Sequence, residues 1–366
     1  MFFYDIPNLL LILIVVLVSF RMGLIPLWLV FFLSLFAFTP FILNDVIFPA
    51  SYMPDQFKYF EKVQSLRYLD TQIGTNIKIW LSTWMLAFIP LPYVETINSL
   101  GFFSRFLATV TVIWLYSSKK LRGWPLLFIL FYPSFLLYSS LALRDTLVFT
   151  FMILSVILFL ENRRLFALLV ALPLVIIKTQ NFFLLIVFYI VHLYFSRGSL
   201  FYRYRHLLII LIIAGIVPSI MSIIELVDFY RRALFIEDGG LYKDYVHLST
   251  FRDFTILAFQ SAPYFLIKPL PWEASNLFQF VQSIENIFIF IFLVFIFLKT
   301  SRVDKNIATK WLVYIVAAFG IYGLVVFNFG TAVRYKFPFV LIAVVGMAYE
   351  LYLKHGVFIS IKETKP

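Results

Sequence analysis

The chain has 366 residues, no cysteine, and 30 lysines and arginines against 19 acidic residues, a net charge of +11. Apolar residues make up 62% of the chain and charged residues only 13%, against about 25% charged residues in ordinary soluble domains. This composition excludes a soluble enzyme, a disordered chain and a disulfide-rich secreted scaffold. It predicts a protein that crosses a membrane many times.

Long apolar runs follow one another along the whole chain. Their apolar residues are continuous rather than periodic, which is typical of helices surrounded by lipid or protein on every side. We therefore expect an all-α, polytopic integral membrane protein with about eleven spans in a single membrane domain, residues 1–366. The runs cover residues 9–20, 24–43, 98–116, 124–138, 140–160, 165–177, 181–195, 207–224, 287–298, 311–329 and 335–353.

Two segments leave alternatives open. Residues 165–195 are too long for one helix, and two short helices that meet near Lys178 fit the flanking charges better than a single long one. Residues 77–90 form a weaker apolar run that ends at Pro90 and Pro92. If that run crosses the membrane, the protein has about twelve spans; we favour a re-entrant or surface helix, which leaves about eleven.

Short basic clusters separate the apolar runs. The positive-inside rule places these clusters, and with them the C-terminus, in the cytoplasm. Two sizeable loops, residues 44–98 and 225–286, then lie on the outer face, the second with amphipathic helices and three prolines that argue against a long helix at residues 262–276. The basic excess is therefore a topology signal rather than a sign of nucleic-acid binding. The clusters lie at residues 119–122, 163–164, 197–205, 299–310 and 354–365.

Cations near the outer membrane boundary are the first functional candidates, because a charge at membrane depth costs a few kcal/mol or more. Arg144 and Asp145 stand where an outer hairpin enters the next helix, and Lys178 stands between two helices too short to span. A local Arg–Asp pair and an interface anchor are the simpler interpretations of these residues. A cluster of such cations would suit a lipid phosphate or pyrophosphate.

Three further cations are candidates for the same phosphate site. Arg105 lies two turns into its predicted helix, and Arg334 and Lys336 come late in the chain. We expect the last two to flank a tight outer turn that includes Gly330, because glycine permits such turns. Snorkelling to the interface and a solvated turn charge are the alternatives here.

Aromatic residues on the outer loops are the second clue. They can stack on sugar faces or form an ordinary interfacial belt. Trp272 is more specific than a belt residue needs to be, because Pro269 and Pro271 precede it and Glu273 follows it. The other aromatic residues considered are Tyr52, Phe57, Tyr59, Tyr264, Phe265 and Phe278.

Common signatures of cofactor and metal enzymes are missing from the sequence. It has no P-loop, dinucleotide-binding glycine motif, nucleophile elbow or HExxH helix, and no acidic pair of the kind that holds a metal for nucleotide-sugar transfer. The four histidines have no metal-ligand spacing. We therefore expect no cofactor and no metal.

Three motifs in order resemble those of the Wzy-type oligosaccharide repeat-unit polymerases, the O-antigen and capsule polymerase family. Residues 132–145 look like its YPS…LRD hairpin, residues 266–286 like its RPFPWE…N…EN stretch, and residues 330–338 like its GTxxRYxxP turn. Asp55 and Tyr59 are similar to its first-loop DxxxY. Lys268 occupies a position where the family usually has arginine. Lysine keeps the positive charge but lacks the planar guanidinium that binds an anion through two parallel hydrogen bonds. The likeness covers most of the chain.

The resemblance implies an inverting, metal-independent glycosyltransferase with a GT-C-like helical fold in the bacterial cytoplasmic (inner) membrane, its active site facing the periplasm. The donor would be a glycan on undecaprenyl pyrophosphate and the acceptor one repeat unit on the same lipid. The product would be a surface polysaccharide such as the O-antigen of lipopolysaccharide. A flippase and a chain-length regulator of the same pathway would be its partners.

Such a reaction needs cations for the leaving pyrophosphate and a base for the acceptor hydroxyl. For the base we rank Glu273 first, then His247 and Asp55, although Glu273 can also serve only to cap the helix after it. Trp272 and Tyr59 are candidates for substrate contacts. The candidate cations are Arg144, Lys178 and Arg334, followed by Arg105, Arg252, Lys268 and Lys336.

Two other functions remain open. An O-antigen ligase or another lipid-phosphate glycosyltransferase would share the fold and the cations but use a different acceptor. A lipid-linked oligosaccharide flippase belongs to another class. Transporters commonly show internal repeats and binding residues near the bilayer midplane, whereas this chain has no visible repeat and its charges lie near the outer boundary.

Overall fold

The computed structural model describes residues 2–44, 46–48, 53–69, 77–196, 200–237, 240–326 and 328–357. Within these ranges every element is a helix, and the one β interaction is an isolated parallel bridge between Asn44 and Phe48. Tyr52 and the basic residues at positions 362 and 365 lie outside the described residues. The all-helical prediction is confirmed for the part of the chain that the structure describes.

The described chain separates into two compact units, each of which we treat by itself. Unit 1 comprises Met1–Leu185 and Ala348–Pro366, and unit 2 comprises Ile186–Met347. The boundaries fall inside two helices, α12 (Thr179–Phe195) and α18 (Phe329–His355).

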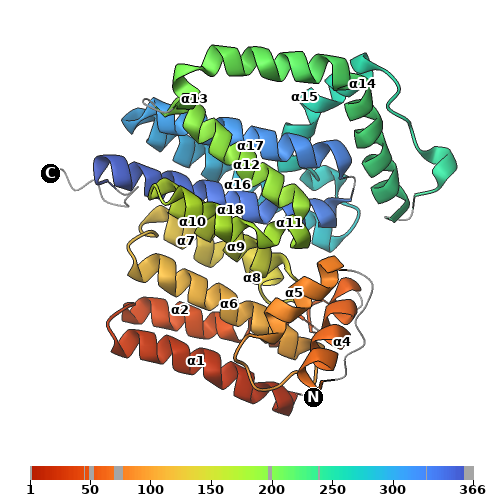
Figure 1. Cartoon of the computed structure of the whole chain (residues 1–366). Coiled ribbons are helices and arrows are strands. Elements are labelled where there is room, and N and C mark those ends of the chain that lie inside the picture. The colour runs from red at the N-terminus through yellow and green to blue at the C-terminus, as the bar shows by residue number, and fades with distance from the viewer. Residues whose placement is uncertain are drawn as a thin grey trace. The chain divides into compact units, whose positions relative to one another are not determined.

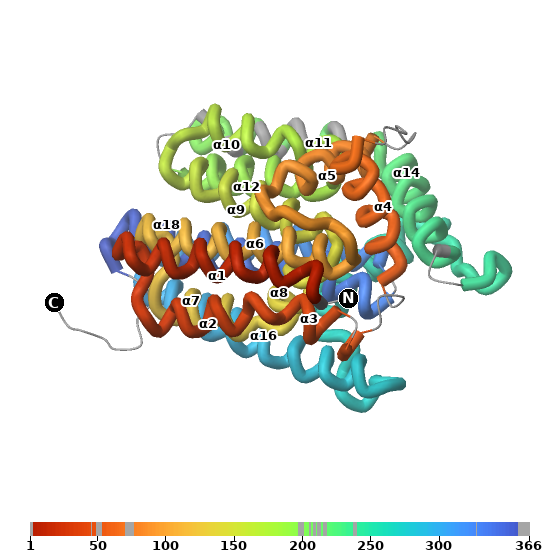
Figure 2. The backbone as a smooth tube through the Cα atoms, turned by 90° about the horizontal axis from the view of Figure 1, so that it is seen from below, coloured from red at the N-terminus to blue at the C-terminus, as the bar shows by residue number. Residues whose placement is uncertain are grey.

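Unit 1 contains the first eleven α-helices (Figure 1). α1 packs against α2 and α6, as Figure 2 shows, α6 against α9, and α9 against α10 and α11. α5 lies between α4 and α11. The bounds are η1 (Phe2–Asp5), α1 (Ile6–Arg21), α2 (Leu27–Ala37), α3 (Thr39–Leu43), α4 (Asp55–Arg67), α5 (Ile77–Ala87), α6 (Ile97–Ser117), α7 (Trp124–Phe131), α8 (Pro133–Tyr138), α9 (Asp145–Leu160), α10 (Arg164–Ala171) and α11 (Pro173–Ile177).

Unit 2 is built around α17, which packs against α14, α15 and α16. The approach of α15 to α17 depends on a glycine: a Cβ at Gly323 would collide with the backbone carbonyl of Ser261. The bounds are α13 (Leu200–Arg203), α14 (Arg205–Glu237), η3 (Tyr242–Asp244), α15 (Phe251–Ile267), η4 (Pro271–Glu273), α16 (Leu277–Val303) and α17 (Lys305–Val325).

Five helical stretches are long and apolar enough to cross a membrane, which indicates a membrane protein. They are Phe3–Arg21, Ile97–Ser117, Leu277–Val303, Lys305–Val325 and Phe329–His355. Four shorter apolar stretches, Leu27–Leu43, Asp145–Leu160, Arg164–Ile177 and Thr179–Phe195, accompany them. The total of about eleven spans stays a prediction.

Several sequence expectations can be compared with these helices. The helix breaks at Lys178, as expected for two short helices. α5 has 11 residues, well short of the roughly 20 that a membrane crossing requires. The predicted loop 225–286 is largely helical: α14 continues to Glu237, and Pro263 lies inside α15. The helix still ends before the remaining prolines, at Ile267.

One local prediction is wrong. Arg334 and Lys336 do not flank a tight turn, because α18 begins at Phe329 and both residues lie within its first turns. The side-chain oxygen of Asn328 accepts from the amide of Gly330 at 2.8 Å and so satisfies one of the unpaired amides at the helix start. Gly330 is therefore part of a helix, and no left-handed backbone is needed there.

Candidate functional site

The YPS…LRD segment of unit 1 forms a buried turn between α8 and α9 that is fixed to α6. A Cβ at Gly101 would collide with the carbonyl of Ser140, so only glycine allows α6 to approach this closely. Ser104 donates to the carbonyl of Leu143 at 3.2 Å. The hydroxyls of Thr39 and Ser140 lie 2.7 Å apart, which ties the same turn to α3.

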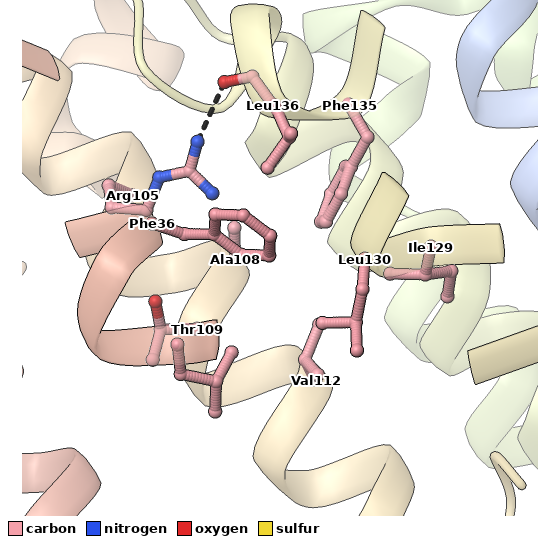
Figure 3. A pocket seen from close by; sticks show the side chains of 10 residues that line it. Phe36, Arg105, Ala108, Thr109, Val112, Ile129, Leu130, Phe135 and Leu136 are labelled. Carbon is pink, nitrogen blue, oxygen red and sulfur yellow. Dashed lines mark hydrogen bonds between the residues drawn. The ribbon is translucent and has the colours of Figure 1, made fainter. Parts of the chain in front are cut away.

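Arg105 is the central part of this attachment. Its side chain is only 2% exposed, and one terminal nitrogen donates to the carbonyl of Leu136 and to Ser140 Oγ, both at 2.6 Å. Leu136 belongs to the last turn of α8, whose carbonyls have no partner within that helix. Figure 3 shows Arg105 at a small pocket whose other walls are mainly apolar side chains, among them Phe36 and Phe135. Arg105 thus has a clear structural role.

Arg144 differs from Arg105 because the protein satisfies little of its hydrogen-bonding capacity. It is the residue before the first turn of α9. Among the described residues it forms no ion pair with Asp145, and its Nε and Nη1 atoms are buried without a hydrogen-bond partner. Its guanidinium carbon lies 6.0 Å from the ring centroid of Tyr59. A guanidinium carries five N–H donors, so this one can still bind an anion.

The first-loop motif reaches the same turn through α4. Gln56 is buried, exchanges two hydrogen bonds with Asn44, and accepts from the backbone amide of Ala142 at 2.8 Å. Tyr59, one turn further, is buried beneath Arg144. Asp55 instead pairs with Lys58 at the surface, at 3.3 Å. Gln56 could not be identified from the sequence, because a glutamine in a polar helix carries no signal of its own.

Lys178 is buried at the break between α11 and α12. Its neighbour Asn181 is also buried, and the Asn181 amide donates to the sulfur of Met152 in α9. Arg105, Arg144 and Lys178 all belong to unit 1. Arg144 contacts the ring of Tyr59, and Arg105 donates to Ser140 in the turn that precedes Arg144.

In unit 2 the other two motifs come together at the end of α15. Lys336 is fully buried and donates through Nζ to the carbonyl of Leu266, at 3.1 Å, and to Asn286 Oδ1. Asn286 in turn donates to the carbonyl of Lys268 at 2.7 Å. Glu285 is close enough to Lys336 to interact with it electrostatically. These contacts satisfy carbonyls at the end of α15 and hold the segment that follows.

The segment that follows, residues 268–273, is held by contacts between its own residues. Lys268 forms an ion pair with Glu273, whose other carboxylate oxygen accepts from the amide of Leu270 at 2.9 Å. Glu273 therefore caps the short helix η4 rather than the helix after it. Trp272, between the two, is 79% exposed.

The remaining candidate cations of unit 2 lie apart from these contacts. Arg334 is half-buried on α18, and Arg252 is exposed in the first turn of α15. His247 lies in the loop between α14 and α15, where its Nδ1 is 2.8 Å from Asp228 Oδ2. Asp228 lies 19 positions earlier on α14, and no motif in the sequence pointed to it.

An apolar cavity of about 360 Å³ opens between α15, α16 and α17. Its walls come from all three helices, for example Pro263, Leu293 and Val316. Leu266 also lines it, and the carbonyl of Leu266 is the one that Lys336 binds. The cavity therefore begins beside the segment that starts at Lys268.

Within the described residues, no group of three or more histidine, aspartate or glutamate side chains could hold a metal ion. The comparisons with known proteins add no family: no protein-family model, no curated protein and no solved structure matches this chain.

Proposed function

We propose that this protein is a glycosyltransferase that polymerises oligosaccharide repeat units carried on undecaprenyl pyrophosphate. It works at the outer face of the bacterial cytoplasmic membrane and extends a surface polysaccharide such as O-antigen or capsule. The fold is GT-C-like with about eleven spans. The donor chain and the acceptor unit are both lipid-linked, and the reaction inverts the anomeric centre without a metal ion.

The observation that carries this proposal is that Arg144 has buried nitrogens without hydrogen-bond partners among the described residues. Buried guanidinium nitrogens without hydrogen-bond acceptors are costly unless a ligand supplies those acceptors. Two of its nitrogens are buried and unpaired among the described residues, beside the ring of Tyr59. A pyrophosphate offers planar pairs of oxygens that match such a fork. Arg144 also occupies the arginine position of the motif that resembles the polymerase family.

The apolar cavity of unit 2 supports a lipid-linked substrate. A hydrocarbon chain fits a cavity lined by Pro263, Leu266, Phe290 and similar side chains. The segment that begins at Lys268 brings a cation, a carboxylate and an exposed tryptophan to its edge. Within this unit the apolar cavity and the segment that presents Trp272 are therefore adjacent.

In the proposed reaction the protein stabilises the negative charge that develops on the leaving pyrophosphate. Donors that are already in place in a water-poor site contribute several kcal/mol to this step. Arg144 is the first choice for this role, and Lys178 and Arg334 are the next. Arg105 and Lys336 hold the surrounding backbone through the contacts described above.

The direct test uses the purified full-length protein in liposomes with synthetic lipid-linked repeat units. We expect chains of two and more units, with inverted linkage, in the presence of a chelator. Arg144→Ala should lower the rate by about 10²–10³-fold, the effect of removing one essential anion donor. Arg163→Lys is the matched control, because Arg163 is exposed at the other end of α9. Full activity of Arg144→Ala would refute the role of Arg144 in binding the pyrophosphate. Loss of transfer with chelator would refute the claim that the reaction needs no metal ion.

A further inference from the structure

A second site stands in the loop between α14 and α15, centred on the carboxylate of Asp228. This carboxylate accepts from the hydroxyl of Tyr245, from Nδ1 of His247 and from the amide of Leu248, each at 2.8 Å. Burial acts to raise the pKa of Asp228, but these hydrogen bonds outweigh it, so the pKa lies below its usual value. Asp228 is therefore ionised and can only accept hydrogen bonds.

This arrangement fixes the tautomer of His247. Because the carboxylate only accepts, Nδ1 of the neutral imidazole carries the proton and Nε2 keeps its lone pair. The side chain of His247 is 47% exposed, and among the described residues Nε2 has no hydrogen-bond partner. An imidazole held by an aspartate with its second nitrogen open is the arrangement that enzymes use for a general base.

Aromatic rings surround the imidazole on the same loop. The ring of Tyr245 meets that of His247 edge-on with centroids 4.9 Å apart, and Tyr242 stands at 6.2 Å. Tyr242 is 59% exposed, so its face is available for a sugar ring. Burial and the bond to Asp228 raise the pKa of Tyr245 to about 12, so the phenol stays a donor.

Several charged side chains flank this site, and Lys243 and Asp244 lie between the two tyrosines. Arg232 lies 5.8 Å from the ring of Tyr242, and Arg231 interacts with Tyr245 and donates to the carbonyl of Leu324 at 2.9 Å. The alternative bases are engaged differently: Glu273 is held by Lys268, and Asp55 by Lys58. Of the three candidate bases, His247 is the one whose reactive atom is both oriented and accessible.

We propose that His247, positioned by Asp228, is the general base that activates the acceptor sugar, with Tyr242 contacting that sugar. This inference rests on the proposed function. In the step, Nε2 takes the proton of the acceptor hydroxyl while its oxygen bonds to the anomeric carbon of the donor. The bond from that carbon to the pyrophosphate oxygen breaks, and its electron pair leaves with the pyrophosphate. The imidazolium then releases the proton to water.

The test measures rates against pH with the full-length protein and lipid-linked units. His247→Gln keeps a side-chain N–H for Asp228, so the loop can stay folded, but removes the base. We expect kcat to fall by about 10²–10⁴-fold with little change in KM. The rate profiles of the wild type and this variant should differ in shape across the pH range, because the variant lacks the base. His355→Ala, at the exposed end of α18, should behave as the wild type.

Asp228→Asn tests the positioning role separately. Asparagine keeps an oxygen that can accept from Nδ1 but lacks the negative charge that stabilises the imidazolium formed in the step, so kcat should fall with little change in KM. If the wild-type protein polymerises and His247→Gln matches its rates at every pH, this inference is overturned and the proposed function stands. If the wild-type protein transfers no sugar, the proposed function itself fails. An unchanged profile in Asp228→Asn would remove Asp228 from the mechanism.

Discussion

The residues of this protein with the clearest structural roles are buried cations that bind backbone carbonyls. Arg105 binds the last turn of α8, and Lys336 binds the end of α15. Both carbonyls come from helix ends, where the backbone acceptors have no partner within the helix and the helix dipole favours a cation. Within the part of the chain that the structure describes, the buried Nε and Nη1 of Arg144 have no such carbonyl, which is why we assign this residue to a ligand.

Lys336 gives a prediction about stability. Lys336→Met should keep the volume but leave the carbonyl of Leu266 and the side chain of Asn286 without their donor. An unsatisfied buried group costs about 1–3 kcal/mol, so the midpoint of thermal unfolding in detergent should fall. Lys305→Met, at the exposed start of α17, is the control. Equal midpoints for the two variants would show that the buried contacts of Lys336 contribute nothing.

Asp228 gives a prediction about pH. Because its pKa in the folded protein lies below the usual value of 3.8, the ionised carboxylate stabilises the loop at pH above that value. This stabilisation is lost as the pH falls through the lowered pKa. The protection of the Leu248 amide against hydrogen exchange should therefore decrease below pH 3.8. In Asp228→Asn the protection should be low at neutral pH and lack this acid transition; a variant with wild-type protection would contradict the assignment.

At the scale of elements, the packing of α15 on α17 depends on two glycines in different ways. A Cβ at Gly323 would collide with the carbonyl of Ser261, whereas a Cβ at Gly320 would meet Ser261 Oγ at 3.9 Å, an ordinary contact. We expect Gly323→Ala to destabilise the protein by about 1–3 kcal/mol through overpacking, and Gly320→Ala to be nearly neutral. Thermal unfolding of the two variants side by side measures the difference. Equal effects would mean that the helices do not approach as closely as described.

The cavity between α15, α16 and α17 gives a prediction about substrate binding. Val316→Trp places a large ring in the cavity, and Val313→Trp places the same ring on the same helix but outside the cavity lining. We expect the first variant to raise KM for units on a long prenyl chain and to leave KM for short-chain analogues unchanged. The second variant should alter neither value. A uniform effect on both chain lengths would show that the cavity does not hold the lipid.

The elements also show what the sequence could predict. Apolar runs located most helices, and the break at Lys178 followed from the length of its segment and the basic clusters around it. The prediction of a turn at Gly330 was wrong. Gly330 and Arg334 are equally compatible with a helix start, and the side chain of Asn328 caps the helix that begins there. The local sequence does not distinguish a turn from a helix start at this position, because the capping contact of Asn328 depends on the backbone conformation of the residues before the helix.

For the whole molecule, composition was enough to predict an all-helical membrane protein, but not the contacts at the candidate sites. Lys336 meets Leu266 across 70 positions, and His247 meets Asp228 across 19. Such pairs depend on how the helices fold against one another, and no spacing rule in the sequence predicts them. The motifs predict which segments carry function, and the structure shows which of their side chains bind backbone carbonyls.

The central claim is that this protein joins lipid-linked repeat units into a polymer. The most direct measurement is a gel of the surface polysaccharide from a host strain in which this protein is deleted, with and without the gene restored on a plasmid. We predict that the long-chain ladder disappears on deletion while single repeat units still reach the final carrier, and that the restored gene returns the ladder. Loss of every unit from the carrier would contradict the account and indicate a ligase or a flippase instead.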